Sequence, residues 1–381
     1  MEASTICANL PSHLSSFVDT FVDFSVSGGL FLLPPPPITN PPPSSLPSPH
    51  RLVAIGDLHG DLTKSKQALR IAGLIDDSDR WTGENTTLVQ VGDVLDRGGD
   101  EIKILYFLEK LKREALRCGG SVVTMIGNHE VMNVDGDFRF VAPSALSEFK
   151  NWADWFQIGV SMKTLCAGCP VPSNIFQGIP NSFPRIRKDF HQGFRARVAA
   201  LRPNGPISTR FLSGNSTVLV VGESVFVHGG LLEEHVNYGL DRINEEMKDW
   251  INGLKGRFSP GFARGKNSMV WLRNFSDKVC DCASLQHVLA TIPGAKRMIM
   301  GHTIQETGIN GVCDNSAIRI DVGMSKGCGN GYPEVLEIIG NSRLRILTTK
   351  PVPVLQRNSS KQNVGLGVLL PEQPRQIQVE A

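Results

Sequence analysis

The chain has 381 residues, of which 41% are hydrophobic and 20% are charged, and its formal net charge at pH 7 is +2. This composition is typical of a soluble globular protein with one large or two ordinary domains. No block of five or six like charges occurs, so we expect no nucleic-acid partner. No run approaches the roughly 18 apolar residues that a membrane-spanning helix needs.

The first 50 residues contain no Lys and no Arg. Secretory signals begin with basic residues and organelle transit peptides are rich in Arg, so we expect no cleavable presequence. Residues 12–24 carry apolar side chains at helical spacing behind Ser12 as candidate N-cap, and they predict a helical arm that packs on the main domain. Residues 34–49 hold nine prolines and predict an extended linker that enters neither a helix nor a sheet. We interpret residues 1–50 as this arm and linker.

Residues 51–350 are predicted to form one domain of the α/β class, because apolar runs of strand length alternate there with helical patterns. The segment of about residues 140–200 differs from the rest. Trp152 and Trp155 recur in it at helical spacing before a loop-like stretch, which predicts a mostly helical insertion. Residues 351–381 are polar without a clear period and are interpreted as a C-terminal tail.

Side chains that can bind metal ions follow several of the predicted strands. The five apolar runs RLVAI, TLVQV, SVVTM, SVFV and RMIM each lead within a few residues to an Asp, Asn or His. Because ligands in α/β proteins gather at the carboxyl ends of strands, we expect these side chains to converge on one crevice. The candidates are Asp57, His59, Asp93, Asn128, His228 and His302.

The residue types in this set indicate the kind of metal site. His, Asp and Asn without Cys suit Mn²⁺, Fe or Zn²⁺ in an open catalytic site rather than a closed structural one. Six ligands are too many for one open ion and suit two. Two ions about 3.5–4 Å apart typically hold the attacking and leaving oxygens of a phosphoryl transfer. Asp93 is the expected bridging carboxylate.

The motifs GDLHG, GDVLDRG, GNHE and HGG, in this order, resemble the four signatures of the phosphoprotein phosphatase family of calcineurin-like metallophosphatases. The resemblance covers roughly residues 51–350. With the long insertion between GNHE and HGG, the later MIMGHT and the proline-rich leader, the chain is most similar to the plant Shewanella-like protein phosphatases. The resemblance implies a four-layer α/β fold, in which a central β-sandwich of mixed sheets is flanked by helices.

The resemblance also implies two divalent metal ions, with Mn²⁺ as the first choice and Fe or Zn²⁺ as alternatives. The ions would share Asp93 as a ligand. The two ligand sets are Asp57, His59 and Asp93 for one ion, and Asp93, Asn128, His228 and His302 for the other. Glu130 of GNHE receives no ligand role, and we expect it to support the ligands from behind.

The remaining motif residues match the chemistry of the reaction. The resemblance implies that His129 protonates the leaving oxygen as general acid, with Asp96 orienting its ring. Arg97, Asn128 and Arg273 would bind the substrate phosphate, since planar guanidinium groups suit phosphate oxygens. The implied activity is that of a protein serine/threonine phosphatase, which hydrolyses phosphate monoesters by in-line attack of a hydroxide bridging both ions. Its partner would be a phosphoprotein substrate.

Three other functions stay open from the sequence. Bacterial diadenosine tetraphosphatases resemble the same motif set, so a dinucleoside polyphosphate hydrolase is one alternative. A phosphotyrosine-preferring phosphatase is the second, because that preference depends on the shape of the groove. The third is a catalytically silent, redox-sensing scaffold, although a scaffold has no need for a complete ligand set.

One loop departs from the pattern of the better-known serine/threonine members. Those carry Ser-Ala-Pro-Asn-Tyr near the final strand, whereas this chain reads SKGCGNGYPE after IRIDVGM. The loop that contacts natural toxins in those members is therefore replaced. We expect insensitivity to okadaic acid and microcystin, and Tyr332 cannot be assigned a phosphate contact.

The eight cysteines include two close pairs, Cys166 with Cys169 and Cys280 with Cys282. Three interpretations remain for these pairs: a zinc site that joins both, ordinary reduced thiols, or disulfides. Some plant Shewanella-like members are associated with the mitochondrial intermembrane space. We therefore expect either that compartment, with a thiol-oxidising partner as a further candidate, or the cytosol.

Overall fold

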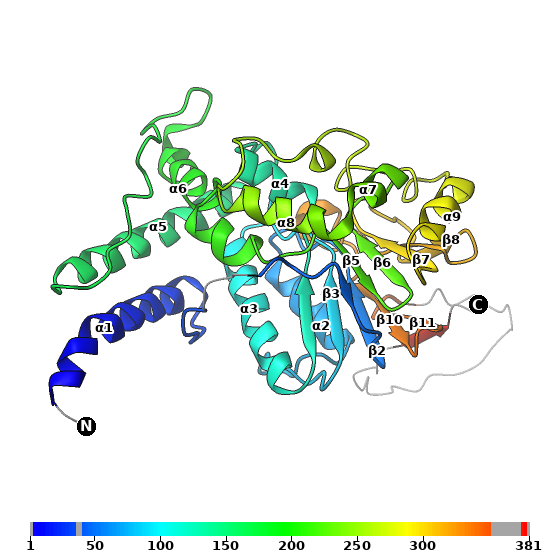
Figure 1. The fold of residues 1–381 in the computed structure, drawn as a ribbon, viewed down its shortest axis with the longest axis horizontal. Helices are drawn as coiled ribbons and strands as arrows, with labels where there is room; N and C mark the ends of the chain where they lie inside the picture. Colours follow the sequence, from blue (N-terminus) through cyan, green and yellow to red (C-terminus); the bar gives the residue numbers. More distant parts are fainter. Residues whose placement is uncertain (1–2, 36–39, 352–374, 379–381) are drawn as a thin grey trace, which may run out of the picture.

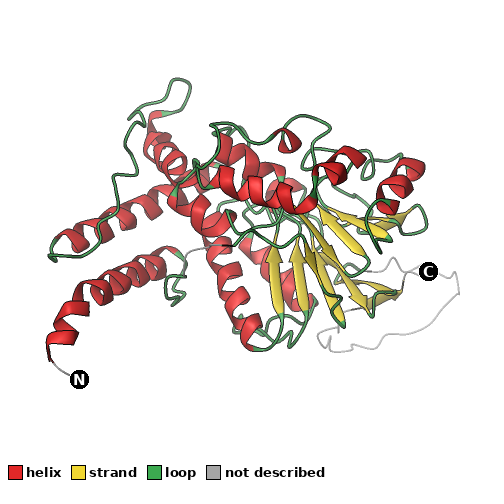
Figure 2. Ribbon diagram, viewed as in Figure 1, coloured by secondary structure: helices red, strands yellow, loops and turns green. Residues whose placement is uncertain are grey.

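In the computed structural model, which describes residues 3–35, 40–351 and 375–378, two six-stranded sheets pack face to face. Each sheet contains both parallel and antiparallel pairs. Helices cover the outer face of each sheet (Figure 1, Figure 2). The predicted four-layer α/β fold is thus confirmed.

The first sheet has the strand order β1-β5-β6-β7-β9-β8. Its strands β6, β7 and β9 run parallel to one another, so their carboxyl ends lie at one edge. In strand order, the bounds are β1 Ser45–Leu46, β5 Val218–Val221, β6 Ser224–Val227, β7 Arg297–Met300, β9 Ala317–Arg319 and β8 Asn310–Val312.

The second sheet has the strand order β12-β11-β10-β2-β3-β4. Here β2, β3 and β4 are the parallel neighbours. In strand order, the bounds are β12 Arg375–Gln378, β11 Arg343–Thr348, β10 Glu334–Ile339, β2 Arg51–Ile55, β3 Thr87–Gln90 and β4 Ser121–Thr124. The segments that follow the parallel strands of both sheets carry the polar motifs.

The apolar runs are continuous because both faces of each parallel strand are buried. In β2, Leu52 and Ala54 belong to the cluster between the two sheets, which also contains Phe226 of β6. The alternate residues Val53 and Ile55 belong to the cluster beneath the helices. Successive side chains of one strand therefore fill two different layers.

Two groups of helices form the outer layers. Helices α2 (Leu62–Ile71) and α3 (Glu101–Arg117) cover the second sheet. Helices α7 (Glu233–Tyr238), α8 (Leu240–Ile251) and α9 (Cys282–Ala290) lie over the first sheet.

The segment between β4 and β5 is mostly helical, with a loop at residues 165–187. It contains α4 (Asn128–Asp135), α5 (Pro143–Thr164) and α6 (His191–Leu201), and a π-helical turn at Ser208–Leu212 precedes β5. Phe149 and Trp152 of α5 pack into the same apolar cluster as α3. This insertion extends the helical layer away from the sheets (Figure 1).

The N-terminal arm is one helix, α1 (Ala3–Val26), that lies beside α5 (Figure 1). Phe21 meets the Trp155 ring edge-on at 5.6 Å, and Asp23 accepts hydrogen bonds from Tyr106 Oη (2.5 Å) and Arg210 (2.7 Å). The expected N-cap at Ser12 is wrong, since the helix begins nine residues earlier than residue 12. The apolar period starts only after Pro11, so the first turns carried no periodic signal.

The proline-rich segment does enter a sheet, contrary to the expectation. Ser45 and Leu46 form the edge strand β1, which pairs in parallel with β5. The Val220 N–H donates to the Ser44 carbonyl at 2.8 Å. Proline is tolerated at the ends of an edge strand, where one side of the backbone needs no partner. Residues 36–39 lie outside the described residues.

The C-terminal segment also differs from a simple tail. Residues 375–378 form β12, which pairs antiparallel with β11 at the edge of the second sheet. The rest of the predicted tail, residues 352–374 and 379–381, lies outside the described residues.

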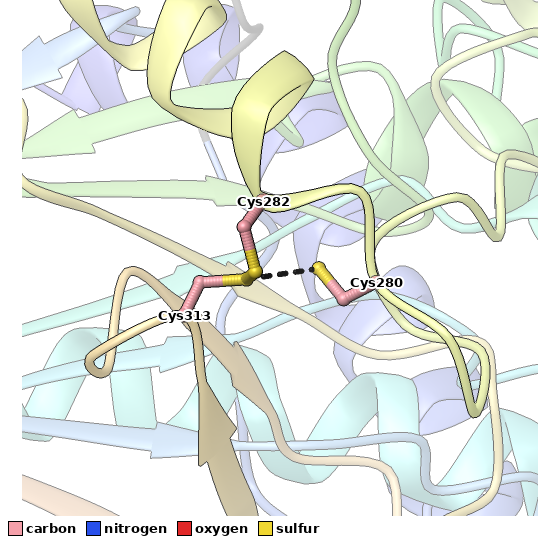
Figure 3. A group of neighbouring side chains, drawn as sticks. All are labelled: Cys280, Cys282 and Cys313. Carbon is pink, nitrogen blue, oxygen red and sulfur yellow. Dashed lines mark hydrogen bonds between the residues drawn. A yellow bond between two sulfur atoms is a disulfide. The ribbon is translucent and has the colours of Figure 1, made fainter.

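The cysteines of the α9 region form a group of three (Figure 3). Cys282 and Cys313 are joined by a disulfide, and Cys280 Sγ lies 3.4 Å from Cys313 Sγ. The interpretation as a zinc site that joins both cysteine pairs is wrong. Cys169 instead contacts the Pro11 carbonyl on α1, away from the α9 region.

Candidate metal and phosphate site

The carboxyl ends of the parallel strands meet at a cavity of about 320 Å³. Motif residues from both sheets line it, as expected for a crevice at strand ends. The lining residues from the predicted set are Asp57, His59, Asp93, Arg97, Asn128, His129, Arg273 and His302. His228 lies directly beneath, fully buried against Asp93.

Asp93 is at the centre of the cluster. Its Oδ2 atom lies 3.2 Å from His228 Nε2, 3.6 Å from His59 Nε2 and 3.8 Å from His129 Nε2. Ligand atoms of two triads, His59–Asp93–His129 and Asp93–His228–His302, lie within 4.8 Å of one another in each. A carboxylate shared by two triads is the arrangement expected of a bridging ligand.

Backbone carbonyls orient two of the imidazole rings. His59 Nδ1 donates to the Leu95 carbonyl and His228 Nδ1 donates to the Val91 carbonyl, each at 2.9 Å. In the neutral ring this bond places the proton on Nδ1 and leaves the Nε2 lone pair facing Asp93. Such a second hydrogen bond typically fixes a metal-binding histidine.

The candidate ligand atoms are arranged as a cation site requires. His228 Nε2 lies 2.9 Å from Asn128 Oδ1 and 3.2 Å from Asp93 Oδ2, so three candidate ligand atoms gather at one point. His302 Nε2 is buried without a hydrogen-bond partner among the described residues. A buried ring nitrogen without a partner beside the Asp93 carboxylate fits a bound cation.

The charges around the cavity support the same fit. Burial lowers the pKa of His59 to about 4 and, with nearby positive charges, that of His302 to about 2, so both rings are neutral as ligands must be. Burial and the charges of Asp321 and Asp93 raise the pKa of Asp57 well above its ordinary value. Crowded carboxylates of this kind are relieved by bound cations.

Asp321 is a residue that sequence reasoning missed. It lines the cavity, is 3% exposed, and follows β9 as the other ligand candidates follow their strands. Burial raises its pKa, and it is paired with Asp57. The signal was present in the run AIRID, which ends in an Asp just as the other five runs lead to a ligand.

His129 and Asp96 form a buried pair. His129 Nδ1 donates to Asp96 Oδ2 at 2.6 Å, which turns Nε2 toward the cavity. Burial alone would lower the pKa of His129, but the charges of Asp93 and Asp96 outweigh burial and raise it. A ring that holds its proton and faces the cavity is suited to donate that proton.

Two arginines flank the cavity. The Arg97 guanidinium stacks 4.7 Å from the Phe140 ring, and the Arg97 N–H donates to the Phe140 carbonyl at 3.0 Å. Arg273 donates to the His302 carbonyl (3.1 Å) and to Thr303 Oγ1 (2.7 Å). Phe140 was not singled out from the sequence, because its role depends on a fold that brings residue 140 beside residue 97.

Backbone strain is concentrated in the motif loops. Several non-glycine residues there adopt positive φ, a conformation that L-residues tolerate at a cost of order 1–3 kcal/mol and that clusters at functional sites. They are His59 (φ 42°), Asp93 (57°), Asp96 (69°), Arg97 (66°) and His302 (65°).

Glu130 holds these loops from behind. Its carboxylate accepts the backbone N–H groups of Asp93 (2.8 Å), Val94 (2.9 Å), Leu95 (3.1 Å) and Gly127 (2.8 Å). Burial and the charge of Asp93 raise its pKa, and the donated N–H groups oppose that rise. Gly127 is required there, because a Cβ would lie 2.2 Å from Asp93 Oδ1. The geometry is that of a support rather than a ligand.

The loop that departs from the better-known members reaches the cavity through Cys328. This residue lines the cavity, and burial raises the pKa of its thiol to about 12. Tyr332 is 52% exposed and is absent from the lining.

A two-sheet α/β sandwich with His, Asp and Asn side chains gathered at the parallel strand ends is typical of a metallophosphoesterase. The family model described as calcineurin-like phosphoesterase matches residues 50–306. The chain belongs to the calcineurin-like phosphoesterases and, within them, to the Shewanella-like protein phosphatases. It is 60% identical to Shewanella-like protein phosphatase 2 of Arabidopsis thaliana, over 99% of this chain and 98% of that one.

Two more distant proteins share part of this chain's sequence or its fold. Shewanella-like protein phosphatase 1 of Plasmodium berghei is 29% identical over 76% of this chain and 71% of its own length. Among solved structures, a cold-active protein tyrosine phosphatase superposes with a TM-score of 0.58 and 20% identity, over 80% of this chain and 78% of its own. At that identity the likeness shows the fold alone. Among the described residues, none of the helices combines the length and the apolar character needed to span a membrane.

Proposed function

We propose that this chain is a protein serine/threonine phosphatase with two divalent metal ions, Mn²⁺ being the first candidate. The observation that supports the proposal most is Asp93, whose Oδ2 atom faces Nε2 atoms of both histidine triads. One ion would be held by Asp57, His59 and Asp93. The other would be held by Asp93, Asn128, His228 and His302. When bound, the ions supply Lewis-acid activation of water and neutralise phosphate charge.

The chain's own residues would perform the remaining steps. Arg97 and Arg273 bind the phosphate oxygens, with Asn128 beside them, and Phe140 fixes the plane of the Arg97 guanidinium. Water oxygen bonds to phosphorus as the ester P–O bond breaks. The proton on His129 Nε2 moves to the leaving oxygen, so the products are an alcohol and orthophosphate.

Phosphotyrosine preference is the second candidate, and one observation favours it. The cavity has apolar walls from Phe140, Trp271 and Ile304, which would also suit an aromatic leaving group. Dinucleoside polyphosphates would need basic groups near a second phosphate. The assay below compares both of these alternative substrates with phosphoserine and phosphothreonine peptides.

The test is hydrolysis by metal-reconstituted protein of matched phosphoserine, phosphothreonine and phosphotyrosine peptides and diadenosine tetraphosphate. Fastest turnover of the serine and threonine peptides supports the proposal, and fastest turnover of another substrate replaces it. Asp93→Asn should lower turnover by at least about 100-fold, as expected for loss of a metal ligand. Asp154→Asn, on an exposed pair with Lys150, is the matched control.

The proposal also covers inhibitors. Cys328 lines the cavity and Gly327 packs against the Arg97 backbone, where the replaced loop lies. We expect micromolar okadaic acid and microcystin to leave activity unchanged. Inhibition at nanomolar concentration would show that the replaced loop still forms a toxin site.

The Cys282–Cys313 disulfide bears on the compartment. Disulfides form and persist in oxidising compartments, which within our proposal favours the mitochondrial intermembrane space and a thiol-oxidising partner over the cytosol. Mass spectrometry of protein isolated under alkylation, with and without reductant, measures whether this bond exists in cells.

A further inference from the structure

Arg197 of the insertion helix α6 is a fully buried cation that sequence analysis did not single out. Both carboxylates that pair with it, Asp96 and Glu101, are also 0% exposed. Burying three ionised groups is costly unless each finds several partners. Such an arrangement in a chain of this size calls for an explanation beyond packing.

Arg197 holds the side chain that orients His129. Its Nη2 atom donates to Asp96 Oδ1 at 2.9 Å, while the other oxygen of the same carboxylate accepts His129 Nδ1 at 2.6 Å. The two bonds together fix the rotation of the Asp96 carboxylate. Glu101 completes this side by accepting the Asp96 backbone N–H at 2.6 Å and both Arg197 Nη groups.

Arg197 also reaches His129 by a second route. Its Nε atom donates to Asn133 Oδ1 at 2.8 Å, and Asn133 Nδ2 donates to the His129 carbonyl at 2.8 Å. One guanidinium thus positions the imidazole through Asp96 and the backbone of the same residue through Asn133. Phe149 fixes the guanidinium plane with its ring at 4.6 Å.

We infer that Arg197 is a positioning residue for the acid step, through which the helical insertion aims His129 at the leaving oxygen. The inference rests on the proposed function, in which His129 protonates that oxygen. A planar group with several fixed donors is needed to hold Asp96, Glu101 and Asn133 at once, and a lysine offers one ammonium in place of that fork.

The test compares substrates whose leaving groups differ in how much they need a proton. An alkyl phosphate or phosphoserine peptide expels a strongly basic alkoxide and depends on the acid. p-Nitrophenyl phosphate expels a stabilised phenolate and does not. A group that only supports folding or metal binding would slow both substrates equally. Selective loss on the alkyl substrate is therefore the signature of acid positioning.

We expect Arg197→Met to lower kcat on the phosphoserine peptide by roughly 10- to 100-fold and on p-nitrophenyl phosphate by less than about 3-fold. Arg197→Lys should recover part of the loss. Arg197→Met combined with Asp96→Asn should be no slower than Asp96→Asn alone, since both act on one step. Arg195→Met, on the same helix but held by the Phe176 and Ile179 carbonyls and the Phe176 ring, should match the unaltered chain.

The controls distinguish a failure of this inference from a failure of the proposed function on which it rests. If Asp96→Asn shows the selective loss and Arg197→Met does not, the inference is overturned and the acid role stands. If neither Asp96→Asn nor His129→Gln distinguishes the two substrates, the acid role itself fails. Should Arg197→Met not fold, Arg197→Lys decides: a selective loss supports the inference, and equal effects on both substrates overturn it.

Discussion

Replacing Glu130 with Gln tests how the loops that carry the candidate metal ligands are held. The carboxylate accepts four backbone N–H groups, and an amide would turn its NH₂ group against two of them. A hydrogen bond to a charged acceptor contributes about 1.5–3 kcal/mol, so losing two should cost about 3–6 kcal/mol. That is a large part of the 5–15 kcal/mol by which a typical domain is stable.

Urea unfolding with linear extrapolation measures this cost. Glu148→Gln is the matched control, because Glu148 is less buried and, among the described residues, accepts two backbone N–H groups, those of Ile102 (3.0 Å) and Lys103 (3.2 Å). Burial raises the pKa of Glu148 to about 8, so at pH 7 it is a neutral acceptor, and Glu148→Gln should lose about 0.5–1.5 kcal/mol. The bound-metal content of Glu130→Gln should also fall, because the Asp93 backbone loses its support. If Glu130→Gln loses no more stability than Glu148→Gln, our account of the loops is wrong.

Three further changes test other parts of the structure. Phe140→Leu removes the ring beneath Arg97 and should raise KM by about 2- to 5-fold with kcat little changed, since such a contact is worth about 0.5–1 kcal/mol; an unchanged KM in steady-state kinetics would contradict this. Burial lowers the pKa of Lys112 from 10.5 to about 8, so its charge destabilises the fold below pH 8. The free energy of unfolding should therefore rise from pH 8 to 10.5, and Lys112→Met should abolish that rise in urea titrations. Opening the Cys282–Cys313 disulfide, which spans 31 residues, with Cys282→Ser should cost about 3–4 kcal/mol. A melting temperature equal to that of the unaltered chain would show that the bond adds no stability.

The fold and the convergence of the candidate ligands were predictable because their signals are local. Each parallel strand is an apolar run, and a candidate ligand follows within a few residues, so the local sequence alone places Asp93 and His228 at strand ends. Asp321 also follows an apolar run, so the pattern of a candidate ligand after a strand extends to a sixth strand. Convergence then follows from the parallel alignment of neighbouring strands.

Other features depend on contacts between distant segments and left no local signal. Arg197 lies 101 residues from Asp96 and occupies a helix whose sequence predicts only a helix. The partner of Cys282 is the distant Cys313 rather than a member of either close cysteine pair. The edge strand at Ser45 forms because β5 offers an unpaired edge, which a proline-rich composition cannot reveal. In each case contacts in the folded protein select one partner or pairing among several that the local sequence allows.

Helix α3 connects the parts of the chain that lie outside the metal cluster. Its first residue, Glu101, binds Arg197 and the Asp96 backbone, and Tyr106 one and a half turns later binds Asp23 of the N-terminal arm. Because one rigid helix carries both contacts, the arm and the insertion are anchored to the same element that supports the acid pair. The candidate metal ligands lie on the loops after the strands and depend on Glu130 of α4, whereas the orientation of His129 depends on α3 and α6 together. Changes at the α3–α6 contact should therefore affect proton donation before they affect metal binding.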